Sequence, residues 1–300
     1  MRIINCNAAS LKGRFTSLEK VIHDLKPSLF SLQETHLNKP GQIEIKNSKD
    51  FQVFELTRKG KGGGGLALGA RKDLSPVWVN QGKGETETLT VKVSTGGLEI
   101  RVTNGYRPQN YADNDVKTEF WNYMENEVKA SDQSGAGCVI LMDANSWLGK
   151  DILPDDPNNQ NENGKLFQGF MERNKNLTLL NAHNLCKGSI TRERKVKDRT
   201  EISILDFVVV CERVLPFFKA MKIDEEKEYS LVNFKGKKKK QKAKNSDHNM
   251  IIVDFHLKMK KKCVSYRKEV YSFNDLESLR KYKKLTSQPN AFTRYFENEK

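Results

Sequence analysis

The sequence predicts an α+β fold in which two packed β-sheets carry helices on their outer faces. Short apolar runs rich in valine and isoleucine recur along most of the 300 residues, as strands do. Only a few stretches show the three- and four-residue spacing of an amphipathic helix. Because sheets bury an apolar face, many strands with few helices favour two sheets packed together and flanked by helices.

The predicted strands are short and bounded by turn residues. Residues 88–93 and 98–103 alternate apolar and polar side chains on either side of Ser94-Thr95-Gly96-Gly97, so they form a hairpin. Three glycines, 63–65, lead into another apolar run and mark the entry of a strand. The predicted strands are residues 2–6, 29–32, 51–56, 66–70, 88–93, 98–103, 138–142, 202–211 and 250–257.

Three helices are expected between these strands, at residues 15–25, 116–128 and 164–174. In the first, apolar residues recur at helical spacing and Pro27 stops the run.

The domain organisation follows from changes in composition along the chain. Residues 1–258 are expected to form one domain, and 259–300 a basic linker or partly helical tail. The stretch 235–244 carries seven lysines in ten residues and is interpreted as a long exposed loop.

Composition favours a nucleic-acid partner inside the cell. The formal net charge is +14, which attracts polyanions. Neither a signal peptide nor a membrane span is apparent, and the five scattered cysteines support neither a disulfide framework nor a zinc site. Cys6, Cys138 and Cys211 fall in apolar runs and are interpreted as core residues. We therefore expect an intracellular protein, with access to the nucleus.

Polar clusters stand directly at the ends of the predicted strands, where side chains share one edge of the sheets. Asp206 lies alone in an apolar run and needs a partner, because an unpaired buried carboxylate is costly. Together the clusters offer carboxylate and amide oxygens with one histidine, a set that suits Mg²⁺ or Mn²⁺. They are Asn5-Cys6-Asn7, Gln33-Glu34-Thr35-His36, Asn104-Gly105-Tyr106-Arg107-Pro108, Asp143-Ala144-Asn145, Asp206 and Asn245-Ser246-Asp247-His248.

The order of these clusters resembles that of the endonuclease/exonuclease/phosphatase superfamily, which includes deoxyribonuclease I, apurinic/apyrimidinic endonucleases and retrotransposon endonucleases. The resemblance runs from Arg2 to about Lys258. It implies a four-layer α/β/β/α sandwich of two mostly antiparallel sheets flanked by helices, like deoxyribonuclease I. The motifs are N-x-N, Q-E-T, Y-x-P, D-x-N, a lone Asp and S-D-H, here Asn5/Asn7, Gln33-Glu34-Thr35, Tyr106/Pro108, Asp143/Asn145, Asp206 and Ser246-Asp247-His248.

The resemblance also implies in-line attack of water on a phosphodiester beside a bound Mg²⁺ or Mn²⁺ ion. Glu34 would hold the metal, with Asn5 beside it. Asp143 would orient and deprotonate the water, and Asn145 would fix the water or the phosphate.

The remaining matched residues would act on the phosphate. His248 would donate to a phosphoryl oxygen, and Asp247 would hold its imidazole in the needed tautomer and favour its charged form. Tyr106 would contact the phosphate or stabilise the transition state. Asp206 would orient the leaving group or the network of His248 and its carboxylates.

Within the superfamily, the chain looks most like the endonuclease domain of non-LTR (LINE-type) retrotransposons, on Gln33-Glu34-Thr35-His36-Leu37 and Ser246-Asp247-His248. This implies a DNA-nicking endonuclease acting on double-stranded DNA, with a downstream reverse transcriptase as a possible partner. Two departures affect loop shape, and hence substrate preference: Met142 replaces the usual Gly, and Arg107 the usual small residue before Pro108.

DNA binding is expected to rest on phosphate contacts by basic side chains rather than on base reading. The candidates are Arg107, Lys237, Lys238, Lys239 and Lys240. The lysine run also fits a nuclear-localisation signal or a solvated insert.

Two other functions remain open. One is a phosphodiesterase of the same superfamily that acts on RNA or a phospholipid. The other is a catalytically decayed module that only binds nucleic acid, although the matched side chains are intact.

Overall fold

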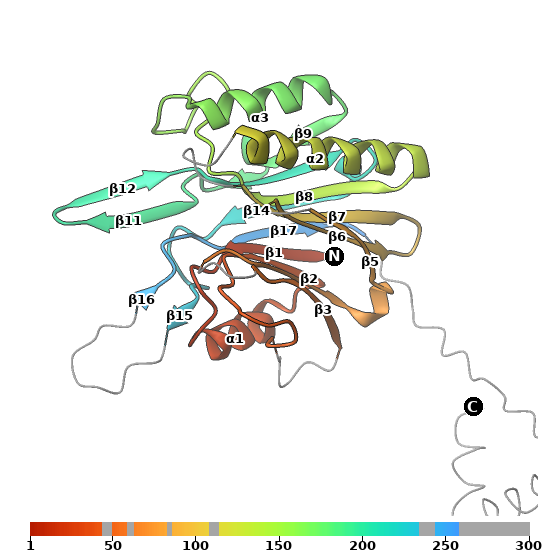
Figure 1. Ribbon diagram of the computed structural model, residues 1–300, viewed down its shortest axis with the longest axis horizontal. Helices are drawn as coiled ribbons and strands as arrows, with labels where there is room; N and C mark the ends of the chain where they lie inside the picture. Colours follow the sequence, from red (N-terminus) through yellow and green to blue (C-terminus); the bar gives the residue numbers. More distant parts are fainter. Residues whose placement is uncertain (44–49, 59–62, 83–85, 108–113, 234–243, 258–300) are drawn as a thin grey trace, which may run out of the picture. The chain divides into compact units, whose positions relative to one another are not determined.

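The computed structural model describes residues 1–43, 50–58, 63–82, 86–107, 114–233 and 244–257. Within them two β-sheets pack face to face (Figure 1). Helix α1 (Phe15–Leu25) covers the outer face of one sheet, and helices α2 (Asn114–Ser134) and α3 (Glu162–Arg173) cover that of the other. The predicted four-layer α/β/β/α sandwich is therefore confirmed.

In the described part of the chain, the first sheet has seven strands: β1 (Arg2–Asn7), β2 (Leu29–Gln33), β3 (Phe51–Leu56), β4 (Leu66–Arg71), β10 (Cys186–Lys187), β14 (Phe218–Ile223) and β17 (Ile251–Phe255). Their order is β10-β14-β17-β1-β2-β4-β3. Strands β1 and β2 are parallel, as are β10 and β14, and the other pairs are antiparallel.

The second sheet contains, among the same residues, β5 (Val77–Gln81), β6 (Glu87–Ser94), β7 (Glu99–Tyr106), β8 (Gly137–Asp143), β9 (Leu177–Leu179) and β13 (Asp206–Cys211). The order is β5-β6-β7-β8-β13-β9, with β7 and β8 parallel and the remaining pairs antiparallel. Both sheets are thus mostly antiparallel, as predicted.

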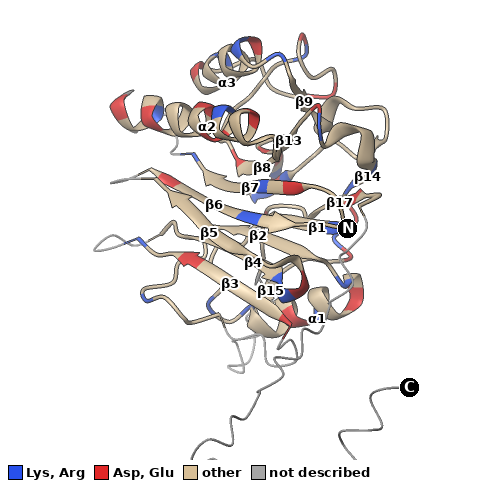
Figure 2. Ribbon diagram, turned by 90° about the vertical axis from the view of Figure 1, so that its right-hand side faces the viewer, with Lys and Arg blue, Asp and Glu red and all other residues tan. Residues whose placement is uncertain are grey.

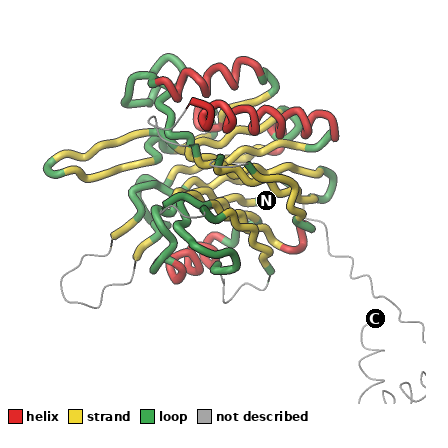
Figure 3. The backbone as a smooth tube through the Cα atoms, viewed as in Figure 1, coloured by secondary structure: helices red, strands yellow, loops and turns green. Residues whose placement is uncertain are grey.

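Two shorter pairs lie outside the sheets: β11 (Arg192–Val196) with β12 (Arg199–Ser203), and β15 (Val232–Asn233) with β16 (Lys244–Asn245). The β11–β12 hairpin extends away from the sheets as a two-stranded arm (Figure 3). The described segments also contain three short turns of 3₁₀ helix, η1 (Lys72–Leu74), η2 (Leu180–Ala182) and η3 (Leu215–Phe217).

Helices α1 and α2 are the crossovers of two of the three parallel pairs among the described strands. A parallel pair needs such a crossover, and it brings the carboxyl ends of both strands to the same edge of the sheet. Helix α1 joins β1 to β2, and α2 joins β7 to β8. The polar residues at the ends of these four strands are therefore collected at two neighbouring sheet edges.

Each outer helix buries an apolar face against its sheet. Leu18, Val21 and Leu25 of α1 are buried in one core cluster with strand residues of the first sheet. Trp121 of α2 packs on the rings of Phe167 and Phe170 of α3, with each pair of centroids 5.1 Å apart. Charged residues gather on α2, α3 and the loops, while the labelled strands of the two large sheets are mostly uncharged (Figure 2). No helix among the described residues has the length and apolarity to cross a bilayer.

Most predicted elements are found. Helix α1 spans the predicted 15–25, the hairpin is β6–β7, and the glycine-led strand is β4. Cys6, Cys138 and Cys211 are buried, as expected. The lysines 237–240 and the predicted tail 259–300 lie outside the described residues.

The predicted single strand 202–211 was wrong. It is two strands, β12 and β13, separated at Ile204 and Leu205. The first half pairs with β11 in the arm, where Ile202 is exposed, and the second half pairs with β8 and β9 in the second sheet. A continuous apolar run shows that strands are present, but it does not show where the hydrogen-bonding partner changes.

Gly69 of β4 provides a test of the packing in the first sheet. A Cβ atom there would meet the Phe30 ring at 2.1 Å. We expect Gly69→Ala to lower the free energy of unfolding by about 1–3 kcal/mol, because the ring has to move in a packed core. Urea denaturation measures this. The control is Gly97→Ala, where nothing lies within 4 Å, and equal stability of the two variants would contradict the packing described.

Candidate active site

The polar clusters of the sequence meet where the ends of β1, β2, β7 and β8 lie beside the start of β13. In the first sheet, Asn7 pairs with Gln33 at the end of the β1–β2 ladder. In the second, Asp143 pairs with both Tyr106 and Asp206. The two sheets thus bring their polar ends together.

The side-chain amide of Asn7 joins the two sheets. Its Nδ2 donates to Glu34 Oε1 at 3.0 Å and to Asp143 Oδ2 at 2.8 Å. Its Oδ1 accepts from the backbone N–H of Ala9 at 2.9 Å, which fixes the orientation of the amide. Two carboxylates from different sheets are therefore held on one amide nitrogen.

Glu34 is held as a carboxylate. Burial raises its pKa, but hydrogen bonds from His36, Asn7 and Tyr106 outweigh burial and bring the pKa to about 2. His36 Nε2 lies 3.3 Å from Glu34 Oε2. The backbone of Glu34 has φ +48°, which is uncommon for a residue with a side chain and typical of functional sites.

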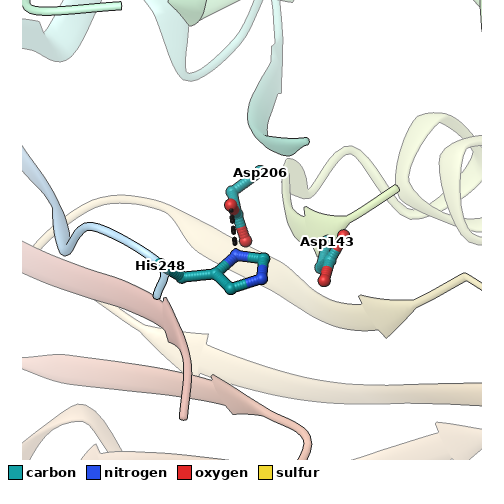
Figure 4. A group of neighbouring side chains, drawn as sticks. All are labelled: Asp143, Asp206 and His248. Atoms are coloured by element: carbon teal, nitrogen blue, oxygen red, sulfur yellow. Dashed lines mark hydrogen bonds and ion pairs between the residues drawn. The ribbon is translucent and has the colours of Figure 1, made fainter. Parts of the chain in front are cut away.

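Asp206 and His248 form a buried pair on the other side of the site. His248 Nδ1 lies 2.8 Å from Asp206 Oδ2, and the other ring nitrogen faces Asp143 (Figure 4). Burial lowers the pKa of His248, but the charge and hydrogen bond of Asp206 outweigh it and raise the pKa to about 9. His248 is therefore an imidazolium at neutral pH, and Asp206 has the partner that its burial requires.

Asp143 lies between these two groups. Its Oδ2 accepts from Asn7, and its Oδ1 accepts from the backbone N–H of Asn145 at 3.0 Å. Burial and the charge of Asp206 raise the pKa of Asp143, against the opposing effect of His248. This carboxyl group is therefore poised to exchange a proton more readily than an exposed aspartate.

The prediction that Asp247 holds the imidazole was wrong. Asp247 Oδ2 instead accepts from Arg192 Nε at 3.0 Å, and Asp206 occupies the Nδ1 side of His248. Asp247 still favours the charged form of His248 through its own charge.

The residue of the N-x-N motif that contacts Glu34 is Asn7, not the predicted Asn5. Asn5 is fully buried, and its Oδ1 accepts from Gln33 Nε2 at 2.8 Å. Both asparagines lie on one face of β1, and only the one nearer the strand end reaches the site.

The predicted DNA contact by Arg107 does not agree with its burial. The side chain of Arg107 is fully buried, and burial lowers its pKa to about 10. Its backbone carbonyl accepts from Asn145 Nδ2 at 2.8 Å, so this segment orients Asn145 beside Asp143. Pro108 and the candidate residues Lys237, Lys238, Lys239 and Lys240 lie outside the described residues.

Thr191 is a site residue that the sequence did not suggest. Its Oγ1 accepts from the backbone N–H groups of Leu205 and Asp206, at 2.8 and 3.1 Å. Its carbonyl accepts from the backbone N–H of Asn249 at 2.7 Å. One buried threonine thus ties Asp206 to the segment that carries His248. A single Thr in a polar stretch gives no signal in the sequence, because its partners are distant along the chain.

The donor set fits a hard divalent cation. Asp143, Asp206 and His248 offer ligand atoms within 4.8 Å of one another. His248 Nδ1 is already bonded to Asp206 Oδ2 at 2.8 Å, so we assign His248 to this hydrogen bond. The carboxylate oxygens of Glu34 and Asp143, both hydrogen-bonded to Asn7 Nδ2, are of the kind that could hold such a cation. Asp206 Oδ1 is buried and has no hydrogen-bond partner among the described residues, which adds to the negative field.

Several solved structures are similar to this chain. The endonuclease domain of TRAS1, a telomere-specific non-LTR retrotransposon, is 18% identical, with a TM-score of 0.60 over 85% of this chain and 98% of that one. The 3′-5′ exonuclease NExo from Neisseria meningitidis is 16% identical, with a TM-score of 0.62 over 85% and 99%. D. rerio TDP2, complexed with a single-strand DNA product, is 15% identical, with a TM-score of 0.55 over 85% and 98%. These likenesses show the fold.

No curated protein matches the chain significantly. The family model described as the Endonuclease/Exonuclease/phosphatase family matches residues 4–225. That range contains Asn7, Glu34, Tyr106, Asp143 and Asp206, all of which lie at the site described above. The chain therefore belongs to the endonuclease/exonuclease/phosphatase family.

Proposed function

We propose that this protein is a divalent-metal-dependent phosphodiesterase that nicks double-stranded DNA, as the endonuclease of a non-LTR retrotransposon. One observation carries the proposal: Asn7 holds the carboxylates of Glu34 and Asp143 together, opposite the imidazolium of His248. The family supplies the reaction class, because its members hydrolyse phosphate esters.

The charges of the site suit a phosphodiester. Glu34 and Asp143 would hold a Mg²⁺ or Mn²⁺ ion, which neutralises phosphate charge and assists the leaving oxygen when bound. His248 supplies a second positive charge from the opposite side, and its N–H would donate to a phosphoryl oxygen. The phosphate would thus lie between two positive charges in a buried environment, where electrostatic interactions are strong.

The remaining side chains are placed to handle water and to orient these groups. Asp143 would accept the proton of the attacking water, and Asn145 beside it would fix the water or the phosphate. Tyr106 hydrogen-bonds Glu34, so it would orient the carboxylate that we propose to hold the metal. Asp206 accepts from His248 Nδ1 and thereby orients the imidazolium, so the other ring nitrogen is free to donate.

A described surface that could bind DNA is the β11–β12 arm. Its exposed basic residues are Arg194, Lys195, Lys197 and Arg199. The arm begins at the site, because Arg192 forms a β-bridge with His248 and an ion pair with Asp247. Together with the net charge of +14, this favours nucleic acid over a phospholipid substrate.

The retrotransposon assignment rests on the motif resemblance and on the likeness to the TRAS1 endonuclease domain. It carries two corollaries: a downstream reverse transcriptase as the functional partner, and access of the protein to nuclear DNA.

Nicking of supercoiled plasmid tests the function. We expect relaxation of the plasmid with Mg²⁺ or Mn²⁺ and none with a chelator. His248→Ala should lower the rate about 10²–10³-fold, because it removes a preorganised donor to the phosphate. The control is His256→Ala, which removes an exposed histidine at the end of the first sheet and should nick like the wild type.

Two results would contradict this function. Plasmid binding without nicking in any metal would indicate a decayed binding module. Cleavage restricted to RNA or a phospholipid would indicate the other substrate classes of the family.

The salt dependence of DNA binding tests the arm. We expect the double change Arg194→Ala and Arg199→Ala to weaken binding and to make the dependence of log affinity on log salt shallower by about 2, one unit for each lost phosphate contact. The nicking rate at saturating DNA should stay unchanged. Fluorescence anisotropy with a labelled duplex measures the affinity at several salt concentrations.

Arg213→Ala is the matched control, because Arg213 lies beyond the end of β13 opposite to Asp206 and pairs with Asp132. An equal change of slope in this control would show that the arm has no special part in binding.

A further inference from the structure

Three buried amides lie between the sheets, directly behind the candidate active site. They are Asn5 of β1, Gln33 of β2 and Asn104 of β7, and none of them has exposed surface. Gln33 Nε2 donates to Asn5 Oδ1 at 2.8 Å and to Asn104 Oδ1 at 2.7 Å, with Ser31 Oγ at 3.2 Å. The role beside the metal that the resemblance implied for Asn5 falls to Asn7, and the proposed catalytic roles use none of these three amides.

The direction of every hydrogen bond in this network is fixed by two backbone carbonyls. Asn104 Nδ2 donates to the carbonyls of Leu32 and Ala67, at 3.0 and 2.9 Å. Carbonyls only accept, so Asn104 Oδ1 has to face Gln33, and Gln33 has to present its Nε2. Leu32 and Ala67 are paired residues of β2 and β4, so Asn104 of the second sheet is clamped to two strands of the first.

The contacts among the three amides have the same pattern as the contacts around Glu34, and they lie further inside the protein, between the two sheets. Asn5 contacts Gln33 as Asn7 contacts Glu34, and Asn5 and Asn7 lie two residues apart on β1. Asn104 contacts Gln33 as Tyr106 contacts Glu34, and these two lie two residues apart on β7. Side chains two residues apart on a strand share a face, so β1 and β7 each contribute to both layers, while Gln33 ends β2 and Glu34 follows it directly.

The three amides are not expected to stabilise the fold as much as apolar side chains would. Asn5 Nδ2 and Gln33 Oε1 are buried and have no hydrogen-bond partner among the described residues. A partly satisfied polar network is less favourable than apolar packing of the same shape. Its use is geometric: Gln33 immediately precedes Glu34, whose φ of +48° has to be imposed by surrounding contacts.

We propose that Asn5, Gln33 and Asn104 are positioning residues that fix the alignment of the two sheets at the site, and thereby hold the Glu34 carboxylate where it can bind a divalent cation. This inference rests on the proposed role of Glu34 in holding the cation. The network touches neither the cation nor the phosphate, so it acts only through Glu34 and Tyr106.

Gln33→Met tests the proposal, because methionine keeps the length of the side chain and removes its donor. Mn²⁺ binding to the purified protein without DNA is followed by titration calorimetry, together with urea denaturation and the Mg²⁺ dependence of nicking. We expect Mn²⁺ affinity to fall about 10–100-fold, as when an outer partner of a metal ligand is lost, and half-saturating Mg²⁺ to rise in parallel.

Thr103→Val is the matched control on the same strand. Thr103 precedes Asn104 and points to the opposite face, where its buried hydroxyl hydrogen-bonds Thr90 at 2.9 Å. The control should lose stability and keep its Mn²⁺ affinity. Asn5→Ala is a milder second variant, because it removes a single acceptor. We expect it to lower the Mn²⁺ affinity several-fold. If Gln33→Met does not fold, the Mn²⁺ affinity of Asn5→Ala tests the proposal instead.

Unchanged Mn²⁺ affinity in the folded Gln33→Met or Asn5→Ala protein would overturn the proposal and leave the proposed function standing. Failure of the wild-type protein to bind Mn²⁺ or to nick would instead overturn the proposed function, and the positioning role with it.

Discussion

The site depends on one amide, that of Asn7, which holds carboxylates from two different sheets. Two carboxylates this close repel each other unless donors or a cation lie between them. Asn7 supplies two of these donor contacts, and the backbone of Ala9 fixes the orientation of the amide. The remaining negative charge of Glu34 and Asp143 makes the same place attractive to a divalent cation.

The positive charge of His248 faces the carboxylates of Glu34 and Asp143, and the order of the strands causes this arrangement. Asp206 begins β13 next to the end of β8, and Thr191 fixes it against the segment that carries His248. The buried carboxylate keeps the imidazole protonated. A phosphodiester placed between His248 and a cation at Glu34 would have its charge balanced from both sides, which is how preorganised electrostatics accelerates phosphoryl transfer.

The sequence predicted the layers and nearly all of the residues that meet at the site. Periodicity indicated which runs are buried strands and helices, and polar clusters at strand ends indicated a shared edge. The order of the clusters, which resembles that of a known family, then allowed Glu34, Asp143 and His248 to be chosen without coordinates. The pairing within the cluster could not be predicted. Asp206 rather than Asp247 contacts His248, and Asn7 rather than Asn5 contacts Glu34, because these choices depend on strand register and side-chain direction. Thr191 and the burial of Arg107 were missed for the same reason.

The most direct test of this account is anomalous diffraction from crystals of the protein grown with Mn²⁺. The account predicts a peak bound by carboxylate oxygens of Glu34 and Asp143, at roughly the 2.0–2.1 Å seen in magnesium sites, with His248 still bonded to Asp206. A peak liganded by His248 and Asp206, with none near Glu34, would contradict it.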